Sequence, residues 1–145
     1  MKRQPYFQEN ILFVVDSCVL IKTKGHRLDP FLHRMLIPTM VKFELGTKPG
    51  RSHILSFLHS VPTLHQLTMD GRIVPFSAQE SIDYVTESKE RIRSQGNDEA
   101  ILDACRMCRQ TTILVTDDVN MRLKARCFGV AVCSSTELLV HMQQA

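Results

Sequence analysis

Acidic side chains follow apolar runs at two places in this sequence, and they are the residues best suited to chemistry. Residues 111–116 (TTILVT) form a β-branched, apolar run typical of a buried strand, and Asp117 and Asp118 follow it directly. Residues 11–15 (ILFVV) form a second such run, which ends at Asp16. In open parallel sheets, ligands and metals bind at the carboxyl ends of the strands. The pattern raises the question of whether other acids reach the same edge.

Two further acids lie near the starts of predicted helices. Residues 39–47 (TMVKFELGT) are predicted to be helical, with Glu44 among apolar neighbours, where a carboxylate is expected to be paired or bound to a metal. Residues 97–100 (NDEA) open another helix, with Asn97 as its predicted N-cap and Asp98 in its first turn. Taken alone, solvent exposure explains Glu44 equally well, and the helix dipole fully explains Asp98.

Local explanations also exist for the acids at the strand ends. Asp118 is well suited to be the N-cap of a helix predicted over 119–126, and an isolated Asp-Asp pair is commonly one cap and one solvated carboxylate. Capping explains Asp16 as well as ligand binding does. Whether the fold brings the acids together decides between the two explanations.

The predicted order of elements favours an α/β fold with three layers, α/β/α, and a central, mainly parallel, Rossmann-like sheet. In this arrangement the strands point the same way, so the acids meet at one edge. The predicted strands lie at 11–15, 35–37, 72–76, 111–116 and 128–133. The predicted helices lie at 39–47, at 52–67 with a bend at Pro62, at 77–93, from Asn97, at 119–126 and at 136–142.

Composition predicts one domain over residues 1–145, led by a polar segment at 1–10. The chain has 43% hydrophobic residues, enough for a core, and a net charge of +3, which permits an anionic partner. Five cysteines and no long apolar run favour a reduced, intracellular setting, cytoplasmic or nuclear. Cys105 and Cys108 are predicted to pack on a helix, since no second ligand pair for zinc is present. The histidines at 53, 59 and 65 do not share a helical face and are expected at the surface.

Four carboxylates at one edge repel each other unless cations hold them. The four acids expected to meet there are Asp16, Glu44, Asp98 and Asp117. Oxygen ligands without histidine or cysteine suit Mg²⁺ or Mn²⁺. The sequence therefore predicts a site for one of these two cations.

The motifs VVDS (14–17), FE (43–44), NDEAIL (97–102) and LVTDDVNMRLKA (114–125) resemble PIN domains, which are metal-dependent ribonucleases. The last two resemble the eukaryotic branch that includes the endonuclease of nonsense-mediated mRNA decay. The resemblance implies a PIN-like fold and gives the same four acids the catalytic, metal-binding positions. It places Ser17 at the hydroxyl position, and Asp118 and Asn120 at supporting positions. The family commonly has Asn or Ser where this chain has Cys18.

The resemblance implies hydrolysis of phosphodiester bonds within RNA. Single-stranded RNA is the expected substrate, because a backbone that enters a narrow carboxylate cleft has to bend. Basic residues must bring the phosphates in against the repulsion of the acids. The candidates are Lys22, Lys24, Arg27, Lys48, Arg51, Arg122 and Lys124.

Two other classes of function share features with this sequence. The first is a catalytically silent PIN-like adaptor that acts in RNA processing or decay by binding protein or RNA, against which the full set of four acids argues. The second is a receiver-type phosphoacceptor domain, which also clusters acids around Mg²⁺. A receiver needs a paired acid at the first strand and a lysine after the last one, and the sequence has neither.

Overall fold

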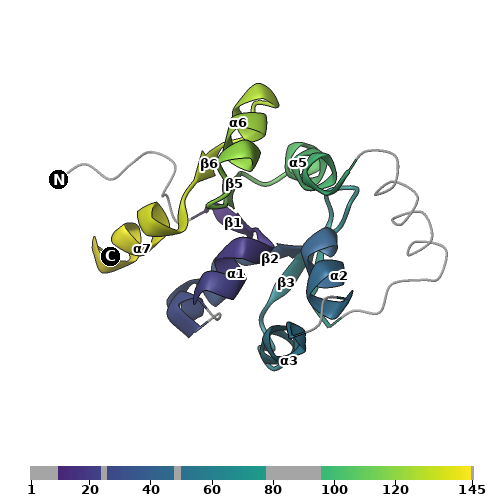
Figure 1. Ribbon diagram of the computed structural model, residues 1–145, viewed down its shortest axis with the longest axis vertical. Helices are drawn as coiled ribbons and strands as arrows, with labels where there is room; N and C mark the ends of the chain where they lie inside the picture. Colours follow the sequence, from purple (N-terminus) through teal and green to yellow (C-terminus); the bar gives the residue numbers. More distant parts are fainter. Residues whose placement is uncertain (1–9, 24–25, 48–49, 78–95, 145) are drawn as a thin grey trace.

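The computed structural model describes residues 10–23, 26–47, 50–77 and 96–144 (Figure 1). The strands are β1 (Leu12–Val15), β2 (Met35–Pro38), β3 (His65–Leu67), β4 (Ile73–Pro75), β5 (Thr112–Val115) and β6 (Val132–Cys133). The helices are α1 (Ser17–Thr23), the 3-10 helix η2 (His26–Arg34), α2 (Thr39–Thr47), α3 (Ser52–His59), α5 (Asn97–Met107), α6 (Val119–Cys127) and α7 (Ser135–Gln144).

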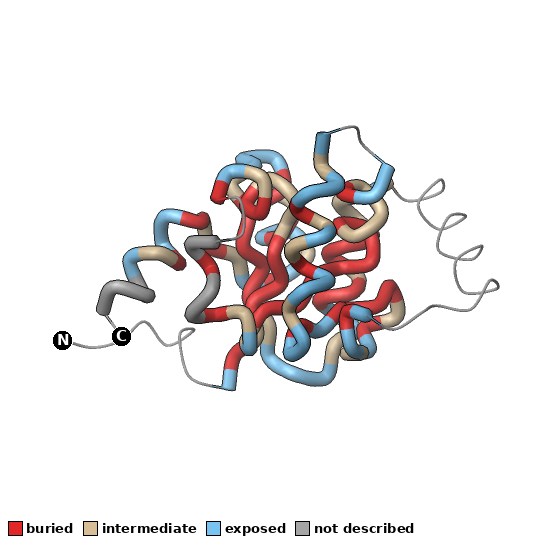
Figure 2. The backbone as a smooth tube through the Cα atoms, turned by 90° about the horizontal axis from the view of Figure 1, so that it is seen from below, coloured by how far each residue is buried: buried red, intermediate tan, exposed pale blue. Residues whose placement is uncertain are grey.

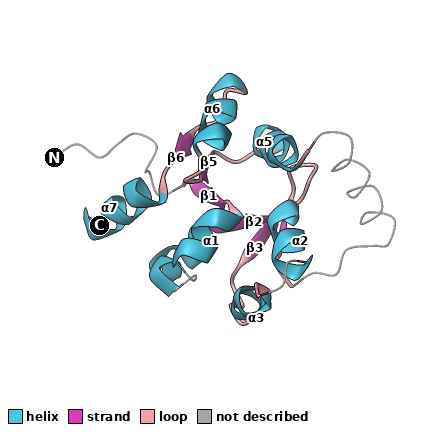
Figure 3. Ribbon diagram, viewed as in Figure 1, coloured by secondary structure: helices cyan, strands magenta, loops and turns pink. Residues whose placement is uncertain are grey.

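The six strands form one sheet in the order β4-β3-β2-β1-β5-β6. At its centre β1 pairs in parallel with β2 and β5, so that Phe13 lies beside Met35 and Ile113. Helix α1 lies on one side of the sheet and α5 and α6 lie on the other (Figures 1 and 3). The predicted three-layer, mainly parallel α/β fold is confirmed.

The core follows the central strands. Phe13, Val14 and Val15 of β1 are fully buried, and Leu114 and Val115 of β5 are as well. Figure 2 shows that buried segments of the chain lie at the centre of the molecule. Burial on both faces of the sheet explains why these strands are continuous apolar runs without alternation.

Strand β3 was missed, because residues 52–67 were predicted to be one bent helix. Helix α3 instead ends at His59, before Pro62. The three residues of β3 pair in parallel with β2 and antiparallel with β4. A turn joins β3 to β4, with the Thr68 amide donating to the Arg72 carbonyl at 2.9 Å. Strand β2 is distant in sequence while β4 is close, but a run of three residues is too short to show a strand pattern by itself. The expectation that all strands point one way is wrong for β4.

Other boundaries differ by a few residues. The sequence predicts a short helical turn after Ser17, an exposed basic loop and a helix start at Asp29-Pro30. In the structure the turn is the longer helix α1, which extends to Thr23, and the next helix, η2, starts earlier, at His26. Strand β2 extends to Pro38, one residue beyond its predicted end. The last strand is reduced to Val132–Cys133. The helix predicted at 77–93 lies almost wholly outside the described residues.

The three histidines and Cys105 are placed as predicted, whereas Cys108 is not on the helix. All five cysteines are free, and Cys105 lies buried in α5, where desolvation raises the pKa of its thiol to about 12. Cys108 lies just past the end of that helix. The three histidines at 53, 59 and 65 are exposed. Within the described ranges, no helix is long and apolar enough to cross a bilayer.

Candidate active site

Asp16 leaves the carboxyl end of β1 and is half-buried. Its Oδ1 accepts the Ser17 amide at 2.8 Å, and its Oδ2 accepts the Thr116 hydroxyl at 2.8 Å. Burial raises the pKa of Asp16, and the charge of Asp98 raises it further. The hydrogen bonds from Thr116 and Ser17 oppose this shift without cancelling it. The folded protein therefore stabilises the Asp16 carboxylate less well than water does.

Glu44 is connected to two other helices by hydrogen bonds. The Ser17 hydroxyl of α1 donates to its Oε2 at 2.8 Å, and the Asn97 side-chain amide of α5 donates to its Oε1 at 3.3 Å. The prediction that Asn97 is an N-cap is wrong. Gly96 holds the cap position with a φ of 85°, which leaves the Asn97 side chain to reach Glu44. A contact across 53 positions thus replaces the local one.

Asp98 and its neighbour Glu99 both form an ion pair with Lys124. The Lys124 ammonium lies 3.3 Å from Asp98 Oδ2 and 3.2 Å from Glu99 Oε1. The hydrogen bonds to Glu99 and then Asp98 raise the pKa of Lys124. The helix dipole alone, which the sequence favoured for these acids, is supplemented by an ion pair between α5 and α6.

Asp117 is held by the start of the last helix. The Ser135 amide donates to its Oδ1 at 2.8 Å and the Ser135 hydroxyl donates to its Oδ2 at 2.6 Å. The Lys22 ammonium lies 3.6 Å from the same Oδ2. Burial by itself raises the pKa of Asp117, but the Ser135 hydrogen bonds and Lys22 outweigh burial, so the pKa is lowered. This carboxylate is stabilised in its charged form.

The supporting positions behave differently from one another. Asp118 is the N-cap of α6, as predicted, and its Oδ1 accepts the amides of Asn120 at 2.9 Å and Met121 at 3.3 Å. The role of Asn120 in this network is through its backbone. Ser17 bridges two acids, because its amide binds Asp16 and its hydroxyl binds Glu44.

The acids do not form one compact ligand set in this arrangement. Asp16 interacts electrostatically with Asp98, and Ser17 connects it to Glu44. Among the residues that the structure describes, no group of three or more histidine, cysteine, aspartate or glutamate side chains lies ready to hold a metal ion. Two of the acids face a lysine ammonium instead.

The carboxylates of Asp16 and Glu44, the two acids that face no lysine in the described part of the chain, fit Mg²⁺ or Mn²⁺. In the described part of the chain, neither Asp16 nor Glu44 forms an ion pair with a basic residue. Their oxygens are hard ligands of the kind these cations prefer. The charge of Asp16 is also poorly compensated, as its raised pKa indicates. A divalent cation would supply the compensation that the protein does not.

Only some of the predicted RNA-binding residues can be placed. Lys22, 65% exposed, and Lys124, 43% exposed, lie beside acids of the site. Arg122 is half-buried on α6, and Arg51 is the N-cap of α3, with a buried Nη1 that has no hydrogen-bond partner. Lys24 and Lys48 lie outside the described residues, and for Arg27 the backbone alone is described.

Three polar residues of the site were missed. Thr116 follows β5 in the sequence, directly before Asp117 and Asp118, and its side chain is fully buried. The hydroxyl at the end of an apolar run was the one available sign that Thr116 binds Asp16. Asn97 was assigned to a local role. Ser135 lies 18 positions from Asp117, and no pattern in the sequence links the two.

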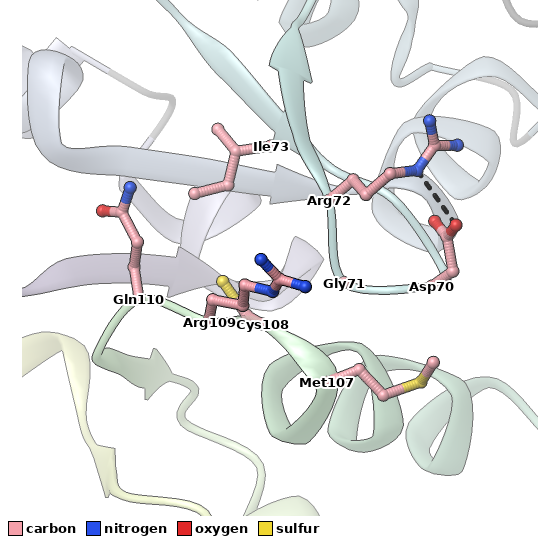
Figure 4. A pocket seen from close by; sticks show the side chains of 8 residues that line it. All are labelled: Asp70, Gly71, Arg72, Ile73, Met107, Cys108, Arg109 and Gln110. Atoms are coloured by element: carbon pink, nitrogen blue, oxygen red, sulfur yellow. Dashed lines mark hydrogen bonds and ion pairs between the residues drawn. The ribbon is translucent and has the colours of Figure 1, made fainter.

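A cavity of about 640 Å³ lies beside the β3–β4 turn (Figure 4). It is bordered by the β3–β4 turn and by residues 107–110, and none of the predicted site residues lines it. Gly71 in this turn has a φ of 84°, and a Cβ there would lie 2.6 Å from the Met107 carbonyl carbon. Glycine thus lets the turn pack against the end of α5.

The sequence and the fold were compared with known proteins. The PIN domain family model matches residues 13–136. The crystal structure of PAE2754 from Pyrobaculum aerophilum has a TM-score of 0.57 at 16% identity, covering 100% of this chain and 99% of that one. The crystal structure of DNA-bound VapBC from Salmonella typhimurium has a TM-score of 0.48 at 16% identity, covering 86% and 98%. No curated protein matches the sequence.

The two kinds of match carry different weight. At 16% identity the Pyrobaculum structure supports the fold alone, and the Salmonella structure is too distant to support an argument. The family model, in contrast, spans most of the sequence and includes all four acids of the site. The chain therefore belongs to the PIN domain family.

Proposed function

We propose that this protein is a metal-dependent endoribonuclease that hydrolyses single-stranded RNA. PIN domains are in general nucleases, which sets the class of reaction. The observation that carries the proposal is the pair Asp16 and Glu44, two carboxylates bridged by Ser17 with no basic residue of the described chain paired to either. Carboxylates left in this state are suited to a divalent cation.

In the proposal, Asp16, Glu44, Asp98 and Asp117 hold Mg²⁺ or Mn²⁺. A cation bound there would lower the pKa of a water molecule and offset negative charge on the phosphodiester. Ser17 and Thr116 orient the Asp16 carboxylate, and Asn97 orients Glu44, through the hydrogen bonds described above. Lys22 and Lys124 supply the positive charge that draws RNA phosphates to this edge.

The finer features of the proposal rest on sequence. Single-stranded RNA is the proposed substrate, because the RNA backbone must bend to reach the carboxylates and a single strand bends more easily than a duplex. The motifs at 97–102 and 114–125 favour the eukaryotic branch that includes the endonuclease of nonsense-mediated mRNA decay, whereas the two solved structures above come from Pyrobaculum aerophilum and Salmonella typhimurium. Protein partners in RNA processing are compatible with this branch.

A circular single-stranded RNA tests the reaction directly, because only internal cleavage opens a circle. Purified protein is incubated with the labelled circle in Mn²⁺, in Mg²⁺ and in EDTA, and a linear RNA is run alongside. We expect linear products with either cation and none with EDTA. Asp16→Asn should be inactive, and Asp103→Asn should be active, because Asp103 lies more than one turn further along α5 than Asp98. Cleavage in EDTA would contradict metal dependence.

The second candidate is the catalytically silent adaptor. It is favoured by the absence of a three-ligand group among the described residues and by the lysines already paired with Asp98 and Asp117. An adaptor would bind the circular RNA, or a protein of the RNA decay machinery, without opening the circle at any Mn²⁺ concentration. Measuring RNA binding beside cleavage separates the two functions.

A further inference from the structure

Helix α7 begins with a reciprocal pair of hydrogen bonds. The Glu137 amide donates to the Ser134 hydroxyl at 3.1 Å, and the Ser134 amide donates to Glu137 Oε1 at 3.2 Å. This capping box satisfies amide groups at the helix start with side chains of the helix itself. The amide and hydroxyl of Ser135, the first residue of the helix, are left to donate elsewhere.

Both of these donors go to Asp117. Ser135 is 2% exposed, and its two hydrogen bonds reach the two different oxygens of the Asp117 carboxylate. A carboxylate held through both oxygens cannot rotate about its last bond without losing one of them. The start of α7 thus fixes the plane of a carboxylate that leaves β5.

The adjacent aspartate shows how specific this arrangement is. Asp118 turns its carboxylate to the amides of its own helix, α6. Asp117 has no such local role, and its oxygens meet Ser135 and the Lys22 ammonium. Each carboxylate oxygen has two lone pairs, so the two Ser135 bonds leave a further lone pair on each oxygen.

We infer that Ser135 is a positioning residue, which orients Asp117 for a cation at the site now faced by Lys22, and that α7 is therefore part of the active site. This inference rests on the proposed function. The role assigned to α7 is to hold the Asp117 carboxylate in place, and this role requires no contact between α7 and the RNA or the metal.

Direct metal binding tests the inference without RNA. The free Mn²⁺ concentration is measured by electron paramagnetic resonance as Mn²⁺ is added to the protein. Ser135→Ala should raise the dissociation constant about tenfold, the effect expected when a ligand loses its orienting partner. Ser135→Thr restores the hydroxyl and should return the constant to within about twofold of wild type. Thr136→Ala, an exposed neighbour in the same turn, is the matched control and should leave it unchanged.

A second measurement does not depend on metal. Unfolding equilibria of Ser135→Ala, Asp117→Asn and the double variant are compared in EDTA. If Ser135 holds Asp117, the effects on the unfolding constant should be non-additive by roughly fivefold. Additive effects would overturn the inference, and so would a coupled pair in which Ser135→Ala leaves Mn²⁺ affinity unchanged. Failure of the wild type to bind Mn²⁺ or to cleave RNA would overturn the proposed function, while the cycle still reports whether Ser135 holds Asp117.

Discussion

The four acids at the edge of the sheet form two pairs, which we call the two halves of the acidic edge. Asp16 and Glu44 differ from Asp98 and Asp117 in the groups that face their carboxylates. Asp16 and Glu44 receive hydrogen bonds from neutral groups of Ser17, Thr116 and Asn97. Asp98 and Asp117 each face a lysine ammonium. The pKa of Asp16 is accordingly raised, with burial as the main cause, while that of Asp117 is lowered.

This difference indicates where a cation gains most. At Asp16 and Glu44 it meets negative charge that the described protein leaves without a positive partner. In the proposed function, a cation bound by Asp98 and Asp117 would replace Lys124 and Lys22, which would then be available for phosphate. The lysine of each pair is well exposed to solvent, which weakens its attraction to the carboxylate and favours such an exchange.

The largest expected effect is the loss of Asp16. Asp16→Asn removes one of the two negative charges of the Asp16 and Glu44 pair. Mn²⁺-dependent cleavage should fall by more than about 100-fold, because the loss of a metal ligand should cost more than the loss of a residue that only orients a ligand. Asp98→Asn and Asp117→Asn should also abolish cleavage. Initial rates on labelled single-stranded RNA measure this, with Asp103→Asn as control. Full activity in Asp117→Asn would remove Asp117 from the site.

A smaller effect is expected at Glu44. Glu44→Gln keeps the size and one neutral oxygen but removes a negative charge, so the Mn²⁺ concentration for half-maximal cleavage should rise about tenfold. Metal titrations of wild type and variant at the same salt concentration measure the shift. Superimposed curves would assign Glu44 to a structural role with Ser17 and Asn97 and leave a site of three aspartates.

The lysines should act in opposite directions on metal and on RNA. Lys22→Met and Lys124→Met remove ammonium groups that compete with the cation, so Mn²⁺ binding without RNA should tighten roughly twofold to fivefold. RNA binding should weaken, and the slope of log K against log salt should decrease by about one unit per lost phosphate contact.

Arg126→Met is the matched control for the lysines, because Arg126 is an exposed basic residue of the same helix as Lys124. It changes the net charge equally and should leave Mn²⁺ affinity unchanged. If Arg126→Met tightens Mn²⁺ binding as much as Lys124→Met, the effect is one of overall charge and the lysines do not occupy the cation positions.

The smallest effects concern stability against pH in EDTA. Because the folded pKa of Asp16 is raised above 3.8, the folded state holds its proton longer, and stability falls as pH rises from about 3.8 through that raised value. Asp16→Asn should therefore raise the melting temperature at neutral pH. Asp117 has a lowered pKa, so its contribution is present above 3.8 and is lost as pH falls through the lowered value. Asp117→Asn should lower the melting temperature at neutral pH.

Thermal unfolding measured from pH 3 to pH 8, a range of about five units around these pKa values, decides the signs. For a chain of this size a change of 1 kcal/mol moves the melting temperature by about 2–4 °C. Shifts of the same sign in the two variants would remove the contrast between the two halves of the edge.

Local physics was enough to predict much of this molecule. The apolar runs at β1 and β5 are buried strands, because burial on both faces leaves no room for polar alternation. Helix α2 spans Thr39–Thr47 as predicted, and Asp118 caps α6, because a helix start depends on residues within one turn. The placement of Asp16 and Asp117 after parallel strands follows from the same runs.

The tertiary structure decided which partner each polar group meets. Strand β3 exists because β2 and β4 supply its hydrogen bonds, which no local pattern announces. Asn97 reaches Glu44 across 53 positions, and Ser135 reaches Asp117 across 18. Side-chain hydrogen bonds and ion pairs depend on distances of about 3 Å between elements. Such distances are set by packing, so the positions of Asp16 and Asp117 after their strands were predictable from the sequence, while the partners of their carboxylates were not.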